Sequence, residues 1–359
     1  MKPMTMRERL LAVLQGRSID RVPLIMYEDL MPIEHNGFRL REQVQKEFGN
    51  RIGLLRWSAI HKVRTPHCRF EVQKFYIDSQ LWDRTTLYTP NGTLFQERAF
   101  EPAYHSASIR KHFISKASDY EVLWNYLEDG QILEDYARYN EDLNDLGEQG
   151  LPLPAVERSP FQQLWVEWVG LDRLALHYED YPDLVEHTVN ILNKRARRIF
   201  EIAYFSPTPF IDFPDNITAE AIGLKRFQKY NVPLYNELAD MLSERNAIVF
   251  VHMDGNLKPL WSAITSSKIG GIDSFSPVPD NDTMVEEAIN MWPDKRLFVN
   301  FPSSVHLRSY DEVRDEAEAI LAAGGHTGRL EIQFSENVPY NVWQTSFKAV
   351  ADAVEAFQP

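Results

Sequence analysis

The sequence contains a single cysteine, Cys68, in 359 residues. One thiol excludes a disulfide framework, a cysteine-rich zinc module and an iron–sulfur cluster held by this chain alone. The sequence also lacks both the GxGxxG and the GxxxxGK[ST] motif, which argues against dinucleotide and nucleotide binding. Chemistry must therefore come from histidine, carboxylate, hydroxyl or aromatic side chains.

Basic residues are in deficit, since 38 Lys and Arg stand against 52 Asp and Glu, for a net charge of −14. An acidic surface repels phosphate backbones and anionic lipids, so we expect neither nucleic acid nor a membrane as a partner. No apolar run approaches the roughly 18 residues that cross a bilayer. The basic N-terminus is not followed by the apolar core of a signal peptide. These absences predict a cytoplasmic protein.

Short apolar segments typical of buried strands recur along the chain, at 23–27, 51–57, 151–155, 209–213, 247–253, 270–275, 296–301 and 329–334. In the second half they alternate with amphipathic helical segments, the last over about 340–356, as parallel βαβ units do. Eight strands favour a closed, TIM-type (β/α)8 barrel over an open doubly wound sheet. We predict one barrel domain over residues 1–359.

A region at about 70–115 has a different pattern and is predicted to be a β-hairpin insertion in the N-terminal half. The turn signal Pro90-Asn91-Gly92 predicts that Thr86-Leu87-Tyr88 pairs with Thr93-Leu94-Phe95.

Two capping boxes predict helix starts, Thr5 with Glu8 and Ser118 with Glu121. The acidic stretch that follows residue 118, through Asp142 and Asp145, is expected to form a solvated helix face.

Polar side chains gather where the predicted strands end, which is where the function of a barrel of this kind collects. They are Tyr27, Asp215, Asn216, His252, Asp254, Asn256, Asp273, Asn300, Ser303, Ser304, His306, Glu331, Gln333, Glu336 and Asn337. The opposite strand ends carry mostly Gly, Lys and Arg. This asymmetry predicts an enzyme.

His252 and Asp254 form the strongest local pattern. Side chains two apart on an extended segment point the same way, so the pair can hold one metal ion, while Gly255 lets the chain turn away. The alternative is a hydrogen-bonded pair that orders the loop. Asp215 could act as a base or an orienting group, or it could cap the helix that follows. His306 could contact a polar substrate, or it could have a capping or loop role. Tryptophans at a barrel mouth would suit an aromatic ligand.

Four segments resemble the uroporphyrinogen-decarboxylase-like proteins. They are Arg7-Glu8-Arg9 with residues 16–23, residues 88–94, His252-Met253-Asp254-Gly255, and residues 336–339 with Trp343 beyond. The resemblance runs from about residue 5 to 356 and implies a TIM-type barrel. It also implies one of two activities: porphyrinogen decarboxylation, or zinc-dependent methyl transfer that works with a corrinoid protein.

The decarboxylases carry an arginine-rich motif near the N-terminus that grips the carboxylates of the porphyrinogen. Here that region reads Tyr27-Glu28-Asp29-Leu30-Met31, whose acidity would repel such a substrate. The resemblance therefore favours the methyltransferases.

The methyltransferases bind zinc through a His-x-Cys pair and a further cysteine after the last strand. By this resemblance His252, Asp254 and Glu336 are the metal ligands, with Glu331 as the alternative to Glu336. Oxygen ligands in place of thiolates leave a harder, more Lewis-acidic metal, which suits a methyl ether better than a thiol. In this respect the chain resembles the O-demethylase type.

The implied reaction moves a methyl group from a methoxylated, aromatic substrate to Co(I) of a separate corrinoid protein, with zinc stabilising the departing phenolate. The chain lacks a DxHxxG corrinoid-binding motif, so the cobalamin would arrive on the partner. Asp215, Asn216 and Tyr27 would position the substrate or move a proton. Asn256, Asn300 and His306 would contact the substrate.

Two other interpretations stay open at this point. One is a metal-free decarboxylase in which Asp215 or Asp254 manages a carbanion. The other is a non-catalytic relative that binds a corrinoid protein or a tetrapyrrole.

Overall fold

A computed structural model describes residues 3–28, 40–101, 106–336 and 338–359. The chain divides into two compact units. The first comprises Met1–Ile60, Tyr136–Ala155 and Ser206–Pro359, and the second His61–Asp135 and Val156–Phe205. The single domain over 1–359 stays a prediction.

The first unit contains a closed barrel of eight parallel strands, in the order β1-β14-β13-β12-β11-β10-β9-β2. Their bounds are β1 (Leu24–Tyr27), β2 (Gly53–Ala59), β9 (Gly150–Ala155), β10 (Phe210–Phe213), β11 (Ile248–His252), β12 (Gly271–Phe275), β13 (Arg296–Asn300) and β14 (Leu330–Phe334). The predicted (β/α)8 fold is confirmed, with a strand at each of the eight predicted places.

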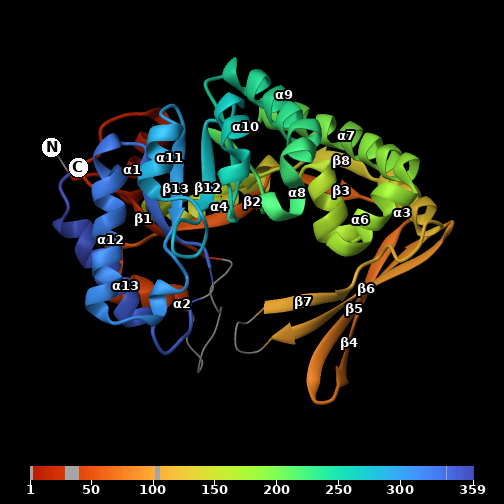
Figure 1. Cartoon of the computed structure of the whole chain (residues 1–359), viewed down its shortest axis with the longest axis horizontal. Helices are drawn as coiled ribbons and strands as arrows, with labels where there is room; N and C mark the ends of the chain where they lie inside the picture. The colour runs from red at the N-terminus through yellow and green to blue at the C-terminus, as the bar shows by residue number, and fades with distance from the viewer. Residues whose placement is uncertain (1–2, 29–39, 102–105, 337) are drawn as a thin grey trace. The chain divides into compact units, whose positions relative to one another are not determined.

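One helix precedes the first barrel strand, and the others lie between barrel strands or after the last one. In the second half they alternate with the strands as predicted. They are α1 (Met6–Gln15), α2 (Leu40–Phe48), α4 (Tyr136–Leu146), α8 (Ala219–Arg226), α9 (Val232–Ser243), α10 (Trp261–Ser266), α11 (Val285–Met291), α12 (Tyr310–Gly324) and α13 (Trp343–Ala356). Helices α12 and α13 pack side by side (Figure 1). The capping box at Thr5 is confirmed, since its side chain accepts from the Glu8 amide and Glu8 accepts from the Thr5 amide.

The second unit contains a four-stranded antiparallel sheet, formed by β4 (Arg69–Ile77), β5 (Gln80–Thr89), β6 (Gly92–Glu101) and β7 (Ser106–Lys111). The predicted hairpin is confirmed in register, with Thr86 opposite Phe95 and Tyr88 opposite Thr93. Strands β3 (His61–Arg64) and β8 (Gln131–Glu134) pair separately. The helices are α3 (Asp119–Asp129), α5 (Pro160–Gln163), the π-helical η3 (Leu164–Trp168), α6 (Leu171–Asp180) and α7 (Pro182–Phe205).

The predicted capping box of Ser118 with Glu121 is wrong, although the helix that it predicts is present. Helix α3 begins at Asp119 after Ser118, whose side chain makes no capping bond. The Asp119 carboxylate instead accepts from the backbone amides of Ser115 and Lys116, at 2.7 and 3.1 Å. A carboxylate one residue later satisfies the free amides of the preceding turn, so the predicted Ser118 cap is not needed.

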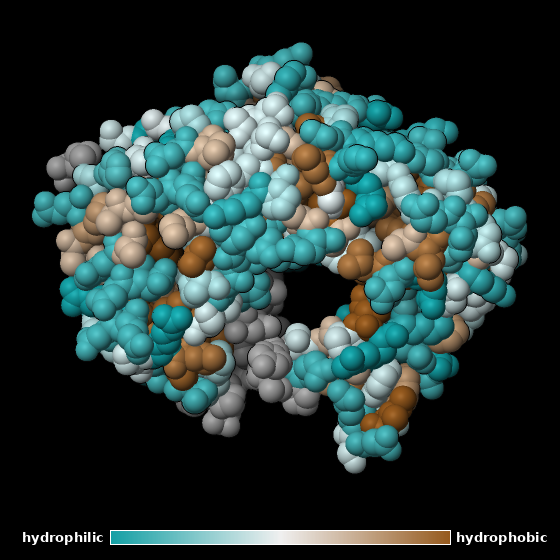
Figure 2. Space-filling model, viewed as in Figure 1, coloured by the Kyte–Doolittle hydropathy of each residue, from teal (hydrophilic) through white to brown (hydrophobic). Residues whose placement is uncertain are grey.

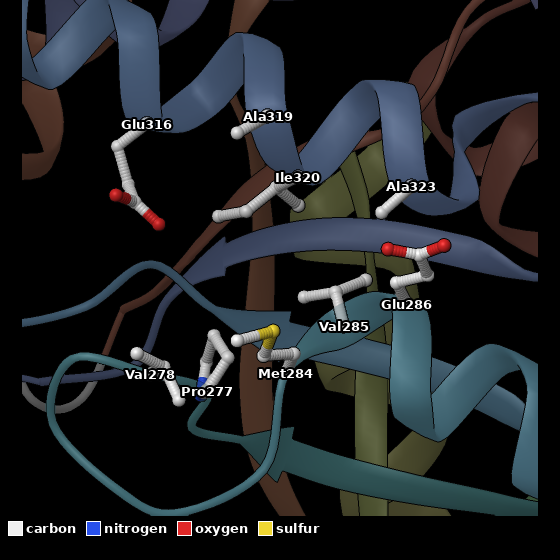
Figure 3. A pocket seen from close by; sticks show the side chains of 9 residues that line it. All are labelled: Pro277, Val278, Met284, Val285, Glu286, Glu316, Ala319, Ile320 and Ala323. Atoms are coloured by element: carbon white, nitrogen blue, oxygen red, sulfur yellow. The ribbon is translucent and has the colours of Figure 1, made fainter.

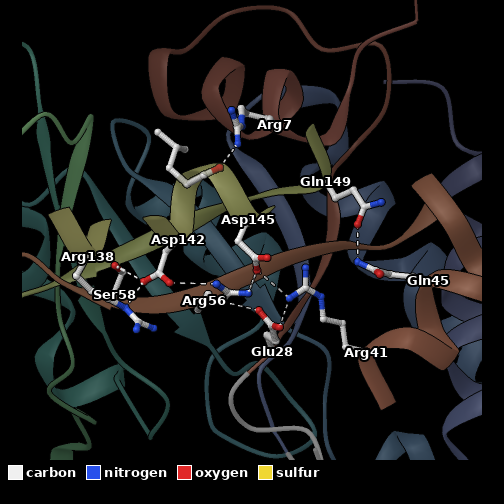
Figure 4. Close-up of polar contacts among 11 residues, drawn as sticks. Arg7, Glu28, Arg41, Gln45, Arg56, Ser58, Arg138, Asp142, Asp145 and Gln149 are labelled. Atoms are coloured by element: carbon white, nitrogen blue, oxygen red, sulfur yellow. Dashed lines mark hydrogen bonds and ion pairs between the residues drawn. The ribbon is translucent and has the colours of Figure 1, made fainter. Parts of the chain in front are cut away.

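The prediction of a solvated acidic helix face is also wrong at Asp142, because this residue is buried. Its carboxylate lies 3.0 Å from Arg56, accepts from Ser58 at 2.8 Å and pairs with Arg138 at 3.0 Å (Figure 4). Helix α4 therefore turns this acid toward β2, and the charge is compensated by two arginines.

The visible face of the molecule is mainly hydrophilic, with apolar residues in scattered patches (Figure 2).

Aromatic side chains fill one layer of the barrel interior. The Phe250 ring lies 5.7 Å from Phe210 and 4.5 Å from Phe298, measured between centroids. Because side chains on a strand alternate with period two, the residues two positions further on face the same interior, nearer the carboxyl ends of the strands. Those residues are Asp212, His252 and Asn300. The core therefore changes from aromatic to polar toward the functional end of the barrel.

Candidate active site

One buried carboxylate, that of Asp273 on β12, contacts side chains from three other strands of the barrel. Its Oδ2 lies 2.8 Å from Nδ1 of His252, on β11, and accepts a short hydrogen bond from the Tyr27 hydroxyl, on β1. Its Oδ1 accepts from Nε2 of Gln333, on β14, at 3.3 Å. A carboxylate only accepts, so the His252 proton on this side sits on Nδ1. Nε2 is then the ring atom left to act on a ligand.

An irregularity in β12 shapes this arrangement. Ser274 has a left-handed φ of 51°, and the pairing of β12 with β13 shifts register between Ile272 and Phe275. The Ser274 hydroxyl consequently also faces Tyr27, at 3.4 Å, and accepts from Gln333 at 2.8 Å. Bulges of this kind re-aim side chains beside functional sites. Two successive residues thus contribute polar groups to one place.

On its other side, His252 faces the loop that follows β11. Its Nε2 lies 3.6 Å from Oδ2 of Asp254, and the same oxygen accepts from Nδ2 of Asn216 at 2.8 Å. Asn216 has a φ of 50°, which asparagine tolerates better than most residues. The structure therefore brings together three predicted site residues, His252, Asp254 and Asn216, with Tyr27 reached through Asp273.

The electrostatics follow from this geometry. Burial alone would lower the pKa of His252, but the hydrogen bonds and charges of Asp254 and Asp273 outweigh it and raise that pKa well above its usual value. Burial alone would raise the pKa of Asp254, yet His252 and Asn216 lower it. An imidazole between two carboxylates is a place for a proton or a cation.

Gly255 is required by a close approach. A Cβ at this position would lie 2.2 Å from the Cβ of Thr218. The amide of Gly255 also donates to the carbonyl of Ile217 at 3.1 Å, which ties the two exit loops together. This contact fixes the loop that carries Asp254.

The fit to zinc is partial. His252 and Asp254 offer a nitrogen and an oxygen across 3.6 Å, and the Asp273 carboxylate orients the imidazole as carboxylates orient many metal-binding histidines. Desolvation of the Glu336 carboxylate and the charge of Asp254 raise its pKa. Over the described ranges, no three His, Cys, Asp or Glu side chains form a group that could hold a metal ion. His252 and Asp254 thus lie together as two ligands, and Glu336, the predicted third ligand, does not form a group with them.

Glu331, the alternative ligand, lies deeper in the barrel. It is the register partner of Phe298, in the aromatic layer, and is fully buried. Neither carboxyl oxygen has a hydrogen-bond partner among the described residues. Burial and the charge of Asp273 raise the pKa of Glu331 well above its usual range.

Asp215 is fully buried after β10. Its carboxylate accepts a short hydrogen bond from the Tyr235 hydroxyl and another from Asn231 at 3.4 Å. These contacts join the loop to the helices behind it, so they support the orienting role of Asp215. Its action as a base stays a prediction.

The predicted substrate-binding asparagines make structural contacts. Asn256 donates to Glu220 at 2.5 Å. Asn300 donates to Ser276 at 3.2 Å and accepts from the Ser335 hydroxyl at 2.8 Å, which braces the ends of β12, β13 and β14. Their contact with substrate stays a prediction.

His306 lies in an aromatic cluster of the core. Its Nδ1 is 2.6 Å from the Ser346 hydroxyl, and the rings of Phe301, Phe334 and Phe347 surround it at 4.9 to 6.2 Å. Burial lowers its pKa to about 3. These surroundings explain His306 as a neutral packing residue, and its contact with substrate stays a prediction.

Trp57, near the end of β2, adds an aromatic wall to the site. Its ring centroid lies 5.7 Å from that of Tyr27, nearly perpendicular at 82°, and 6.1 Å from that of His252. Trp57 is half-buried, so part of the indole remains accessible. This is the kind of surface on which an aromatic ligand packs.

The expected acidity after β1 is compensated at Glu28. This carboxylate accepts from Arg41 at 2.5 Å and from Arg56 at 2.7 Å (Figure 4). Two arginines therefore offset the charge of Glu28. Asp29, Leu30 and Met31, like Asn337 in the last exit loop, lie outside the described residues.

A separate cavity of about 260 Å³ lies between α11, α12 and the loop after β12 (Figure 3). Glu316 and Glu286 lie toward its two ends, with Val285 and Ile320 between them. None of its lining residues belongs to the site around His252.

No protein-family model matches the chain, and no curated protein matches it. Among solved structures, a methyltransferase from Methanosarcina mazei is similar over 99% of both chains, with a TM-score of 0.59 at 14% identity. A B12-independent methionine synthase from Shewanella sp. aligns over 90% of this chain and 86% of its own, with a TM-score of 0.44 at 13% identity. The first similarity shows a shared barrel fold. No helix in the described part of the chain is long and apolar enough to cross a membrane.

Proposed function

We propose that this chain is a methyltransferase that takes a methyl group from a methoxylated aromatic substrate and delivers it to Co(I) of a partner corrinoid protein. The observation that carries the proposal is the pair His252 and Asp254, facing each other at 3.6 Å with the imidazole oriented by Asp273. The methyltransferase that shares the fold over the whole chain supports the reaction class.

In this proposal His252 and Asp254 hold zinc, and Glu336 completes the set when the metal binds. Zinc, when present, would supply Lewis-acid stabilisation of the phenolate as the methyl group leaves. Asp273 keeps the proton on Nδ1 of His252, so that Nε2 stays available. Asn216 holds the Asp254 carboxylate in place, at 2.8 Å.

The remaining residues serve the substrate. Trp57 presents its indole to the aromatic ring, beside the imidazole of His252. The Tyr27 hydroxyl donates to Asp273 and keeps that carboxylate from rotating. The corrinoid protein is the methyl acceptor and the source of cobalamin, because this sequence lacks a corrinoid-binding motif.

The test begins with metal analysis of the purified protein. We expect about one zinc per chain, lost in His252→Ala and Asp254→Ala and retained in His326→Ala, a variant of an exposed histidine. Glu336→Ala should weaken zinc binding. Methyl transfer from methoxyarenes to a reduced corrinoid protein should then follow zinc content. A wild-type protein that binds no zinc would remove this mechanism.

A second candidate is a metal-free decarboxylase of a small acid, favoured by the raised pKa of His252 between Asp254 and Asp273. The protonated imidazole would then deliver its Nε2 proton to the carbanion left by CO2. Activity that releases CO2 and survives chelation would support this candidate. Corrinoid-protein binding without turnover of any substrate would instead indicate a non-catalytic relative.

A further inference from the structure

Strand β4 is an open edge of the antiparallel sheet in the second unit. It pairs with β5 over all nine residues from Arg69 to Ile77, and no strand of the described chain pairs with its other side. Eight of these nine residues are exposed. Val72 and Tyr76, on one face, are 62% and 72% exposed, which is unusual for large apolar side chains. The strand thus offers unpaired backbone groups beside apolar side chains.

The two edges of this sheet differ in how they are protected. The opposite edge, β7, has six residues and a register shift against β6 near Glu97, which disrupts regular pairing. Strand β4 has no proline, no glycine and no shift in its register with β5. Of the features that protect natural edge strands, β4 has only charged side chains, namely Arg69, Glu71 and Lys74. Long, regular edges of this kind pair with another strand.

We propose that β4 pairs antiparallel with β4 of a second copy of this chain, across a two-fold axis at Gln73, to form a continuous eight-stranded sheet. This inference is independent of the proposed function. A two-fold axis perpendicular to a sheet pairs residues of the same face, so the axis must pass midway between the two copies of one residue. An axis at Gln73 is the choice that pairs all nine residues.

The side chains are compatible in this register. Phe70 lies opposite Tyr76, Glu71 opposite Phe75, and Arg69 opposite Ile77, each twice. Lys74 lies opposite Val72, so that its aliphatic stem covers an apolar neighbour. No two like charges are opposed. An axis one residue later, at Lys74, would place the two lysines against each other, which is unfavourable.

The test uses two substitutions at Val72, whose side chain is mostly exposed in the single chain. Val72→Lys places one lysine opposite Lys74 of the partner copy, twice in the dimer, and Val72→Glu places one carboxylate at each of these two positions. We expect a wild-type dimer by analytical ultracentrifugation. The dimer dissociation constant of Val72→Lys should exceed that of Val72→Glu by roughly 10-fold. Equal circular dichroism and melting of both variants would show that the fold is retained.

Crosslinking tests the register. Two Gln73→Cys chains would meet at the axis and form an intermolecular disulfide on mild oxidation. Glu71→Cys places the thiols four residues apart along the strands, roughly 13 Å, beyond the reach of a disulfide. The native Cys68, which is buried, is common to both variants. Two results would overturn the proposal. One is a wild-type protein that stays monomeric at 200 μM, a figure on the order of 10-fold above common assay concentrations. The other is an equal effect of the two Val72 substitutions on the dimer dissociation constant.

Discussion

His252 and Asp273 are register partners on the neighbouring strands β11 and β12, and Nδ1 of the imidazole lies 2.8 Å from Oδ2 of the carboxylate. Because the carboxylate is fully buried and also accepts from Tyr27, it cannot turn away from the imidazole. The barrel therefore holds the Nδ1 side of the ring, while Asp254 in the exit loop faces its Nε2 side.

Asp273→Asn should lower the pKa of His252, since an anionic hydrogen-bond acceptor is lost. If zinc binds as proposed, its affinity should fall by roughly 10- to 100-fold. NMR titration of His252 in metal-free protein measures the first effect, and calorimetry with zinc the second. Ser276→Ala, further along the same chain segment, should leave both unchanged. An unaltered His252 titration would show that Asp273 does not control this ring.

Trp57→Ala should weaken the binding of a methoxyarene by about 10-fold, since stacking of this kind contributes roughly 0.5–1.5 kcal/mol beyond area burial. Trp57→Phe should retain most of the affinity. Calorimetric titration compares them, with Trp261→Phe, on helix α10, as a control that leaves binding unchanged. Full affinity in Trp57→Ala would place the aromatic substrate elsewhere.

His306 should make the protein sensitive to acid. Its pKa is lowered to about 3 when folded, whereas an unfolded histidine takes up its proton near pH 6.5. The unfolded state therefore binds more protons between these values, and stability is lost as the pH falls from 6.5 toward 3. The full effect is on the order of 5 kcal/mol.

His306→Gln keeps a hydrogen-bonding group near Ser346 but cannot titrate. We expect its free energy of unfolding, from urea melts between pH 4.5 and 7, to vary less with pH than that of the wild type. His326→Gln, at an exposed position, should follow the wild type. Parallel curves for wild type and His306→Gln would contradict the prediction.

Arg56→Met should destabilise the fold by about 3 kcal/mol. The substitution leaves the Asp142 carboxylate, 4% exposed, without one of its two arginines and removes a partner of Glu28 and Asp145. Arg198→Met breaks an exposed pair with Glu201 and should change the unfolding free energy by less than about 0.5 kcal/mol. Urea denaturation measures both, and equal effects would mean that the Arg56 network contributes no more than a surface pair.

The barrel could be predicted because its strands are buried on both faces and appear as short apolar runs, and because Pro90-Asn91-Gly92 specifies a hairpin turn. His252 and Asp254 could be predicted because they are two apart along the chain, at the end of one strand and the start of its exit loop. Their convergence with Asn216 follows from the rule that the carboxyl ends of parallel strands share one edge.

The role of Asp273 could not be predicted, because it depends on the register between β11 and β12, which no pattern within one strand encodes. The left-handed Ser274 likewise carries no local signal, since serine is not a residue that favours this conformation. Asp142 resembled its acidic neighbours in sequence, and only the position of Arg56 on β2 distinguishes it. In each of these cases the contacts of the residue depend on which strands and side chains pair in the folded protein, and residue type alone does not reveal them.

The barrel is closed by the pairing of Leu24 with Ile332, residues 308 positions apart (332 − 24). During synthesis, β1 leaves the ribosome first and must wait for β14 before this seam can form. A nascent chain that ends before β14 therefore exposes two unpaired barrel edges, and folding to the final state follows release of nearly the whole chain. Ribosome-stalled chains of increasing length should accordingly become protease-resistant in the barrel only after β14 has emerged.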